Sequence, residues 1–191
     1  MLIILCLTKI KLIKTIYLAG GCFWCTEAVF QRVNGIISVF PGYIDGTIKN
    51  PAYREVCTGR TGHTEAISVT YDDTLVNLTS LLLIFFNTHD PTTLNQQGND
   101  IGTQYRSGIY FTEAEQQSVS LTIIKQLDAE GVFNSPIVTE VKEATTFYKA
   151  DEDHVNYYNE NKTQPYCTFI IDPKIEKFKN YFTNYITTID E

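Results

Sequence analysis

The sequence predicts a single α+β domain. Strand-like and helix-like segments alternate along the chain, and neither an internal repeat nor a linker divides it. A length of 191 residues suits one domain with a full core, and 43% hydrophobic with 19% charged residues is typical of a globular protein. Residues 15–191 are therefore interpreted as one domain, and residues 1–14 as an N-terminal extension that frays.

The first half of the chain predicts three strands and two helices. The expected elements are a strand over residues 12–18, a helix over Phe23–Arg32, strands over Ile36–Phe40 and Glu65–Tyr71, and a helix over Leu78–Asn87. Gly35 is a typical stop after the first helix, and Asn77 can cap the second through its side-chain oxygen. Segment 41–62 is rich in glycine and proline, so we expect it to be irregular. The second helix should bury the face that carries Leu81, Leu82, Phe85 and Phe86.

The second half predicts further strands and three helices. The expected elements are a loop over 90–103, a strand over Ser107–Phe111, a helix up to Glu130, a strand over Ile137–Val141, a short helix up to Glu160, a strand after Cys167 and a last helix. Thr112 and Glu115 have the spacing of a capping box at the start of the first of these helices. Asp151 can cap the short helix, and Pro173 after Asp172 is favoured in a first helical turn.

Charge and cysteine usage argue against several classes of protein. A formal net charge of −7 argues against nucleic acid as a partner, because no basic patch could offset phosphate repulsion. The apolar segment Met1–Leu7 is too short to span a membrane, and no cleavage site is obvious after it. Five cysteines are an odd number, without the density of a secreted disulfide scaffold. We therefore expect a cytoplasmic protein without membrane or nucleic-acid partners, in which one cysteine pair cycles.

The run Ala19–Glu27 is the most informative part of the sequence. Two glycines turn the chain between the first strand and the first helix, and Cys22 stands at the helix start. Unpaired amide N–H groups and the positive end of the helix dipole favour the thiolate there, which is the form that attacks electrophiles. Phe23-Trp24 can line an apolar pocket beside the sulfur, and Cys25 completes a Cys-x-x-Cys motif. The alternative is a buried core cysteine.

Two long loops hold the polar residues that a reactive cysteine would need. Long loops in a compact domain are unusual unless they build a site. The first loop contains Tyr53 and ends at Glu65, and the second contains Asp100 and Tyr105. The three histidines lie far apart in sequence and lack metal-ligand spacing, so we expect structural roles for them and no metal site.

These segments resemble the peptide methionine sulfoxide reductase A family. The motifs that carry the resemblance occur in order between about Tyr17 and Phe178. They are Gly21-Cys22-Phe23-Trp24, Pro51-Ala52-Tyr53-Arg54-Glu55-Val56, Gly62-His63-Thr64-Glu65-Ala66, His89-Asp90-Pro91 and the run from Gln97 to Ser107. The resemblance is to the variant with a Cys-Phe-Trp-Cys motif. It implies a single catalytic reductase domain built as a two-layer α/β sandwich, with a ferredoxin-like core wrapped by long loops.

The resemblance implies a role for each residue around the cysteine. Cys22 would be the nucleophile that attacks the sulfoxide sulfur, and Phe23 and Trp24 would hold the methyl group of the substrate. Glu65 would protonate the sulfoxide oxygen, which requires burial to raise its pKa toward neutral pH. Taken alone, a glutamate in this position is more often a solvated charge.

Three further residues would surround the same oxygen. The resemblance implies that Tyr53 and Tyr105 donate hydrogen bonds to it and that Asp100 completes the polar wall, directly or through water. From the residues alone each has a plainer alternative. Most of the 12 tyrosines must be packing residues, and Asp100 after an asparagine can be a turn former. The ordered motifs favour the functional roles.

Regeneration requires a second thiol. Attack would leave Cys22 as a sulfenic acid, which a resolving cysteine converts to a disulfide. Cys25 replaces a glycine common in the family and lies one helical turn from Cys22, whereas Cys167 belongs to a C-terminal segment also seen in Cys-Phe-Trp-Cys members. We expect Cys25 to resolve because it is nearer, with Cys167 as the alternative, and Cys57 to be a packing residue.

The resemblance implies a reductase of methionine-(S)-sulfoxide, in oxidised proteins or peptides and as the free amino acid. Such an enzyme repairs oxidised proteins, needs no cofactor and receives electrons from thioredoxin.

Two other classes stay open on the residues alone. A general dithiol–disulfide oxidoreductase would explain Cys22 and Cys25 but would have no use for Glu65. A zinc module could use those two cysteines with Cys57 and Cys167, although structural zinc sites usually have two closely spaced pairs.

Overall fold

The computed structural model of the protein describes residues 12–187. Cys6 and residues 1–11 of the expected N-terminal extension lie outside the described residues. The strands are β1 (Ile13–Gly20), β2 (Ile36–Ile44), β3 (Thr64–Asp72), β4 (Gln96–Gln97), β5 (Asp100–Ile101), β6 (Ser107–Phe111), β7 (Glu140–Glu143) and β8 (Tyr148–Lys149). The helices are α1 (Phe23–Phe30), α2 (Tyr53–Cys57), α3 (Leu78–Thr88), α4 (Ala114–Ala129), α5 (Tyr157–Glu160) and α6 (Asp172–Tyr181).

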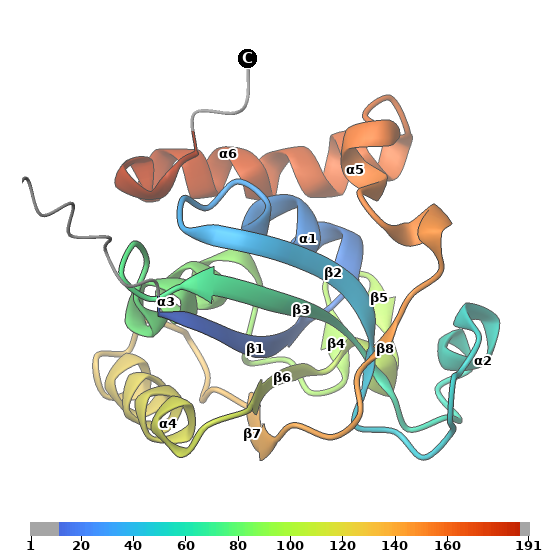
Figure 1. The fold of residues 1–191 in the computed structure, drawn as a ribbon, viewed down its shortest axis with the longest axis horizontal. Helices are drawn as coiled ribbons and strands as arrows, with labels where there is room; N and C mark the ends of the chain where they lie inside the picture. The colour runs from blue at the N-terminus through green and yellow to red at the C-terminus, as the bar shows by residue number, and fades with distance from the viewer. Residues whose placement is uncertain (1–11, 188–191) are drawn as a thin grey trace, which may run out of the picture.

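A mixed sheet of six strands, in the order β7-β6-β1-β3-β2-β8, runs through the molecule (Figure 1). Neighbouring strands are antiparallel except β6 and β7, and β4 and β5 form a separate hairpin. Because β1 and β3 are antiparallel, the end of β1 and the start of β3 meet at one edge of the sheet, with Leu18 opposite Ile67. Cys22 follows the first of these strand ends and Glu65 opens the second, so the pairing itself brings them together.

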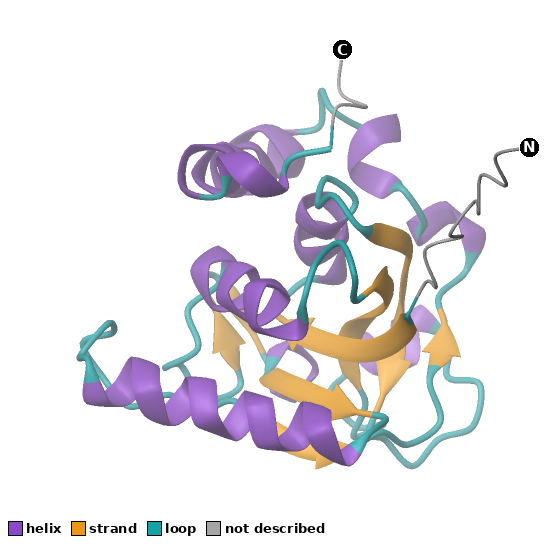
Figure 2. Ribbon diagram, turned by 60° about the vertical axis from the view of Figure 1, so that its left-hand side comes forward, coloured by secondary structure: helices purple, strands orange, loops and turns teal. Residues whose placement is uncertain are grey.

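The core lies between one face of the sheet and a layer of helices. α1 packs on β2 and β3, and α6 lies across α1 and α3 (Figure 2). The other face has a smaller cluster of buried side chains, formed by Ala19, Ile44, Ala66 and Tyr110. Coil around Phe147 covers this face, and the ring of Phe147 stacks on Tyr17 with centroids 5.0 Å apart. The α+β class predicted from the sequence is confirmed.

α3 follows the sequence prediction closely. The Asn77 side chain caps it, since its Oδ1 accepts the N–H of Ser80 (2.9 Å). The buried face consists of Leu81, Leu82, Phe85 and Phe86, each at most 2% exposed. Full burial of one such side chain stabilises a fold by roughly 1.5–3 kcal/mol, so this face anchors α3.

Segment 41–62 is more regular than expected. β2 continues through Pro41 to Ile44, because β3 pairs with it as far as Thr64. Pro41 lacks an N–H but still takes part, since its carbonyl accepts the N–H of Ala150 (2.9 Å). α2 lies in the same segment and carries Tyr53 in its first turn.

The capping box expected at Thr112 and Glu115 does not form. α4 begins at Ala114, and the Thr112 N–H donates to Oε1 of Gln116 (2.8 Å). The Thr112 hydroxyl donates instead to the carbonyl of Thr15 on β1 (2.8 Å). The Thr112 hydroxyl is thus engaged in a hydrogen bond to the neighbouring strand and does not cap α4.

Three other boundaries also differ from the sequence prediction. β7 covers Glu140–Glu143 and not Ile137–Val141, because β6 pairs in parallel only with the later residues. The short helix expected after Asp151 is interrupted. A 3₁₀ turn over Glu152–His154 follows Asp151, whose side chain makes no capping bond, and α5 begins only at Tyr157, because Asn156 has a φ of +58°, which no continuous helix allows. The expected domain boundary after residue 14 falls inside β1, whose first residues pair with β3.

The strand expected after Cys167 is wrong. Cys167–Ile171 is π-helical and runs directly into α6. Cys167 and Ile171 are fully buried while Phe169 between them is 75% exposed, which suits a helix and not a strand, because residues two and four positions apart in a strand share one face.

Candidate active site

Cys22 is the N-cap residue of α1, as the sequence predicts. The turn before it depends on Gly21, which has a φ of +88° and where a Cβ atom would lie 2.5 Å from Cγ of Gln97. The N–H of Cys25 donates to the carbonyl of Cys22 (3.1 Å) and closes the first turn. Both cysteines are reduced and buried, and one helical turn brings them side by side.

The carboxyl group of Glu65 is buried against the start of α1. It is 2% exposed, and its Oε2 accepts the N–H of Phe23 (3.1 Å). Burial raises the pKa of Glu65 to about 8; the Phe23 N–H opposes this shift, and the negative charges of Asp100 and Cys25 add to it. A carboxyl group with this pKa is largely protonated at neutral pH and can donate its proton to a bound oxygen.

The expectation that the helix start favours the Cys22 thiolate is not met. Burial raises the pKa of Cys22 well above its usual value, and the neighbouring Cys25 and Glu65 raise it further. The first amide of α1 cannot compensate, because it donates to Glu65. In contrast, the hydrogen bond from Cys22 lowers the pKa of Cys25 against the effect of burial, and the charge of Lys174 lowers it further. Of the two thiols, Cys25 carries the negative charge more readily.

Tyr53 on α2 and Tyr105 in a 3₁₀ turn lie in two segments that hydrogen bonds join beside β3. Thr64 Oγ1 donates to the carbonyl of Gln104 (2.9 Å), and Gln104 Nε2 donates to the carbonyl of Cys57 at the end of α2 (3.2 Å). Burial raises the pKa of both tyrosines above their usual range, and the charge of Glu65 contributes to each shift. Both phenols therefore stay protonated and can donate hydrogen bonds.

A buried arginine fixes the loop that carries Tyr105. Arg106 donates to the carbonyl of Thr103 (2.9 Å) and pairs with Asp45 (2.9 Å) and Glu140 (3.2 Å). Because Arg106 is 8% exposed, these contacts restrict the backbone on both sides of it.

Aromatic rings surround the two residues after Cys22. Phe23 is 1% exposed and packs against Tyr43 (centroids 5.7 Å apart) and Tyr53 (6.4 Å). One face of Trp24 stacks on Tyr157 at 3.8 Å and 10°. His154 lies between these groups, 5.6 Å from Phe23 and 5.7 Å from Trp24, which the wide spacing of the histidines in sequence did not indicate.

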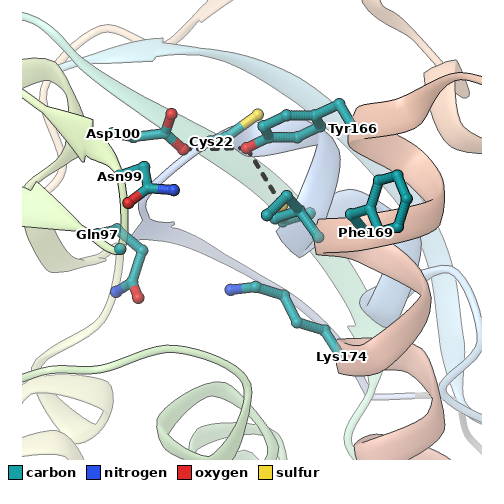
Figure 3. Close-up of a pocket in the computed structure, with 10 residues that line it drawn as sticks. Cys22, Gln97, Asn99, Asp100, Tyr166, Phe169 and Lys174 are labelled. Atoms are coloured by element: carbon teal, nitrogen blue, oxygen red, sulfur yellow. Dashed lines mark hydrogen bonds between the residues drawn. The ribbon is translucent and has the colours of Figure 1, made fainter.

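A cleft of about 520 Å³ opens beside the cysteine pair (Figure 3). The hairpin β4–β5 forms one wall and the C-terminal helical segment forms the other. Its lining residues are Cys22, Cys25, Gln97, Gly98, Asn99, Asp100, Tyr166, Phe169, Ile170 and Lys174. Tyr166 donates to Oδ2 of Asp100 (3.0 Å), and its hydroxyl oxygen lies 3.7 Å from Sγ of Cys25. The lining of this cleft, within the described part of the chain, does not include Glu65, Tyr53 or Tyr105. Cys22 therefore has the cleft on one side and Glu65 on another.

Cys167 does not line this cleft in the described structure. It is fully buried in the π-helical turn, and burial raises the pKa of its thiol. Its neighbour Tyr166, which the sequence analysis did not single out, reaches the cysteine pair instead. The Gln164-Pro165-Tyr166-Cys167 motif could have indicated this tyrosine, whereas nothing in the sequence pattern indicated Lys174.

Among residues 12–187, no three His, Cys, Asp or Glu side chains lie close enough to hold a metal ion. No helix in the same part of the chain is long and apolar enough to cross a membrane.

A cysteine pair at a helix start, beside a buried carboxylic acid, defines a thiol-based oxidoreductase. The family model for peptide methionine sulfoxide reductase matches residues 14–186, so the chain belongs to that family. The chain is 48% identical to peptide methionine sulfoxide reductase MsrA of Trichodesmium erythraeum, over 92% of this chain and 99% of the relative. It is 51% identical to MsrA of Deinococcus radiodurans, over 86% and 80% of the two chains.

A solved structure agrees with the fold. Reduced Mxr1 from Saccharomyces cerevisiae has a TM-score of 0.74 and 32% identity, over 81% of this chain and 89% of that chain. Mxr1 has also been solved in complex with Trx2, and in that form it shares the fold at a TM-score of 0.53 and 23% identity, over 78% and 90% of the chains.

Proposed function

We propose that this protein reduces methionine-(S)-sulfoxide to methionine, in oxidised proteins or peptides and as the free amino acid, and so repairs oxidised proteins. The observation that carries the proposal is the buried Glu65, a protonated acid against the start of the helix that Cys22 caps. A disulfide exchanger has no use for such an acid, whereas a sulfoxide oxygen must be protonated as its bond to sulfur breaks.

The chemical step follows from these positions. The thiol of Cys22 gives its proton to solvent as its sulfur attacks the sulfoxide sulfur, and Glu65 gives its proton to the oxygen. The bond between the oxygen and the sulfur of the substrate then breaks as the oxygen bonds to the sulfur of Cys22, and Glu65 takes a proton back from solvent. Methionine and a Cys22 sulfenic acid result, so the substrate is reduced by two electrons and Cys22 is oxidised by two. Phe23 and Trp24 would hold the S-methyl group, and their aromatic surroundings support an apolar methyl pocket. Asp100, held by Tyr166, would complete the polar wall.

The experiment is to measure NADPH consumption with thioredoxin, thioredoxin reductase and each sulfoxide epimer separately. We expect turnover with the S-epimer, both free and in a peptide, and none with the R-epimer. Faster reduction of a small disulfide than of either epimer would favour a general dithiol–disulfide oxidoreductase and contradict the proposal.

Tyr53 and Tyr105 are proposed to stabilise the sulfoxide oxygen together. We expect Tyr53→Phe and Tyr105→Phe each to lower kcat/KM by less than Glu65→Gln, because either phenol can partly cover for the other, and the double variant to lose more than the two single losses combined. Steady-state kinetics with the S-epimer measure these losses. Tyr110→Phe is the control, since Tyr110 is buried on the other face of the sheet. Purely additive losses would show that the two phenols act independently.

Cys25 is proposed to resolve the sulfenic acid. It shares the first turn of α1 with Cys22 and lines the same cleft, whereas Cys167 is fully buried in a helical turn. The thiol of Cys25 attacks the sulfur of Cys22–SOH, so that a disulfide forms and water leaves. Thioredoxin, which we propose as the reductant, then reduces the disulfide; the yeast relative Mxr1 has been crystallised with such a partner.

The Cys25→Ser variant is expected to form about one methionine per enzyme and then to stall with thioredoxin, because reduction precedes resolution. A dimedone-type reagent should label the accumulated sulfenic acid, and mass spectrometry should place the label on Cys22. Cys167→Ser should continue to turn over. Opposite behaviour of the two variants would assign resolution to Cys167, and a stall in both would indicate a relay from the Cys22–Cys25 disulfide to Cys167.

Three finer points complete the proposal. The electrons come from thiols at every step, so no cofactor is needed. The order β1-α1-β2-β3-α3-β6 supports a two-layer, ferredoxin-like core of the Cys-Phe-Trp-Cys variant of the family. A cycle that returns to free thiols through thioredoxin suits the reducing cytoplasm.

A further inference from the structure

Lys174, in the first turn of α6, lines the same cleft as Cys25. Its ammonium group points from α6 into the cleft, toward the wall formed by Gln97 and Asn99 (Figure 3). It donates one hydrogen bond to the carbonyl of Thr88 at the end of α3 (2.9 Å). A lysine has three donors, so this bond holds the group in place while two donors remain for the cleft.

The charges around the cleft are arranged asymmetrically. Among the described residues that line it, Lys174 is the only cation and Asp100 is the only carboxylate. The hydroxyl of Tyr166 occupies the space between Asp100 and Cys25, bound to the first at 3.0 Å and 3.7 Å from the sulfur of the second. The carboxylate is thus engaged by Tyr166, whereas the ammonium group faces the cleft.

We propose that Lys174 is a positioning residue of the regeneration step: its ammonium group holds Cys25 as a thiolate in the cleft, ready to attack the oxidised sulfur of Cys22. This inference rests on the proposed function. The Cys25 thiolate attacks Sγ of the Cys22 sulfenic acid, the S–S bond forms and the S–O bond breaks. The hydroxide that leaves takes a proton from solvent and becomes water. Cys25 is oxidised by one electron and Cys22 is reduced by one.

The other titratable groups near Cys25 cannot replace this cation. None of them can carry a positive charge, because each is neutral when protonated and negative when ionised: Cys22, Glu65, Asp100, Tyr166 and Cys167. Asp100 opposes ionisation of Cys25, while the charge of Lys174 favours it together with the hydrogen bonds from Cys22 and Tyr166. The thiol of Cys167 has its pKa raised by burial and by the charges of Asp172 and Cys25. The charge of Lys174 thus favours the reactive form of Cys25, whereas burial disfavours that of Cys167.

The test compares Lys174→Met with Lys174→Arg and with the matched control Lys177→Met. Lys177 also lies on α6 and donates to a carbonyl at the end of α3, that of Asn87 (2.7 Å), but it does not line the cleft within the described structure. The first measurement is the alkylation of Cys25 by iodoacetamide in the reduced protein from pH 5 to 10, resolved by mass spectrometry.

We expect Lys174→Met to move the pH midpoint of Cys25 alkylation upward and to lower its rate at pH 7 by about three- to tenfold, because only the thiolate reacts. Lys174→Arg should restore part of the rate, and Lys177→Met should match the parent. A parental midpoint in Lys174→Met, or an equal shift in Lys177→Met, would overturn the proposal.

The second measurement follows one turnover without reductant. Lys174→Met should form methionine at the parental yield but close the disulfide more slowly at pH 7, by a factor similar to the alkylation defect, and recover at pH 9, where Cys25 ionises without help. A defect that persists at pH 9 would indicate a structural role and overturn the proposal. If the parent itself forms no methionine, the proposed function fails, whereas the alkylation profile still decides the role of Lys174.

Discussion

The Cys22→Ser variant is expected to form no methionine from methionine sulfoxide, even in a single turnover. A serine hydroxyl ionises far less readily than a thiol and is a much weaker nucleophile toward sulfur, so neither the attack nor the transfer of oxygen can occur. Chromatographic measurement of methionine per enzyme, without reductant, should give about one equivalent for the parent and none for the variant.

The Cys57→Ser variant is the control for the loss of any thiol. Cys57 is exposed at the end of α2, so the expected packing role is wrong, and it lies outside the cleft of the cysteine pair in the described structure. A serine can keep the hydrogen bond that Cys57 shares with Tyr53. It should keep the parental yield of methionine. A substantial yield from Cys22→Ser would show that a different group attacks the sulfoxide.

The Glu65→Gln variant is expected to lose 10²-fold or more in kcat/KM, which is the usual contribution of a general acid. Glutamine keeps the shape of the side chain and an oxygen that can accept the Phe23 N–H, so the start of α1 should stay in place. Only the transferable proton is lost. Circular dichroism should show an unchanged fold, and the loss should be largest below pH 8, where Glu65 of the parent is protonated.

Glu27→Gln is the matched control for this variant. Glu27 is also a fully buried carboxyl group, with a pKa raised by burial to about 7, and its Oε1 accepts the N–H of Asn156 (2.9 Å). It should stay within a few-fold of the parent, because its carboxyl group holds a loop and donates to no substrate. Equal losses in both variants would mean that removing any buried carboxyl group disturbs the site.

The pH profile of the parent should carry the signature of Glu65. The pKa of this group is raised to about 8 and it must be protonated to act, whereas Cys22, whose pKa is raised well above its usual value, must lose its proton. We therefore expect kcat/KM of the parent to rise with pH up to about 8 and then to level off, because the loss of protonated Glu65 offsets the gain in Cys22 thiolate. The residual activity of Glu65→Gln should keep rising above pH 8, and a parental kcat/KM that rises as steeply above pH 8 as below it would contradict Glu65 as the acid.

Much of the site followed from order in the sequence. The two glycines before Cys22 and the apolar alternation before them predict a strand, a turn and a helix start, and the structure has these three parts. The same reasoning identified α3, because the Asn77 cap and its apolar face are both local signals. It failed where distant segments compete for local groups. The Thr112 hydroxyl donates to β1, and the segment after Cys167 forms a helical turn, with Cys167 and Ile171 buried and Phe169 exposed, where a strand was expected.

The ionisation of the site was beyond the reach of the sequence. The position of Cys22 at a helix start predicts a thiolate. Burial and the carboxyl group of Glu65 instead raise the pKa of Cys22. Glu65 reaches Cys22 only because β1 pairs with β3. The cleft beside Cys25 likewise depends on the C-terminal helical segment, which brings Tyr166, just before the π-helical turn, and Lys174 of α6 next to the first helix.

The sequence by itself determined the kinds of group at the site: a cysteine pair at a helix start, an apolar pair after it, and an acid and two phenols in loops. These are local properties of residue type and spacing. Only the tertiary structure decided which thiol ionises more readily and which residues face the pair. Those properties are set by desolvation and by charges a few ångströms away, and such neighbours come from segments far apart in the chain.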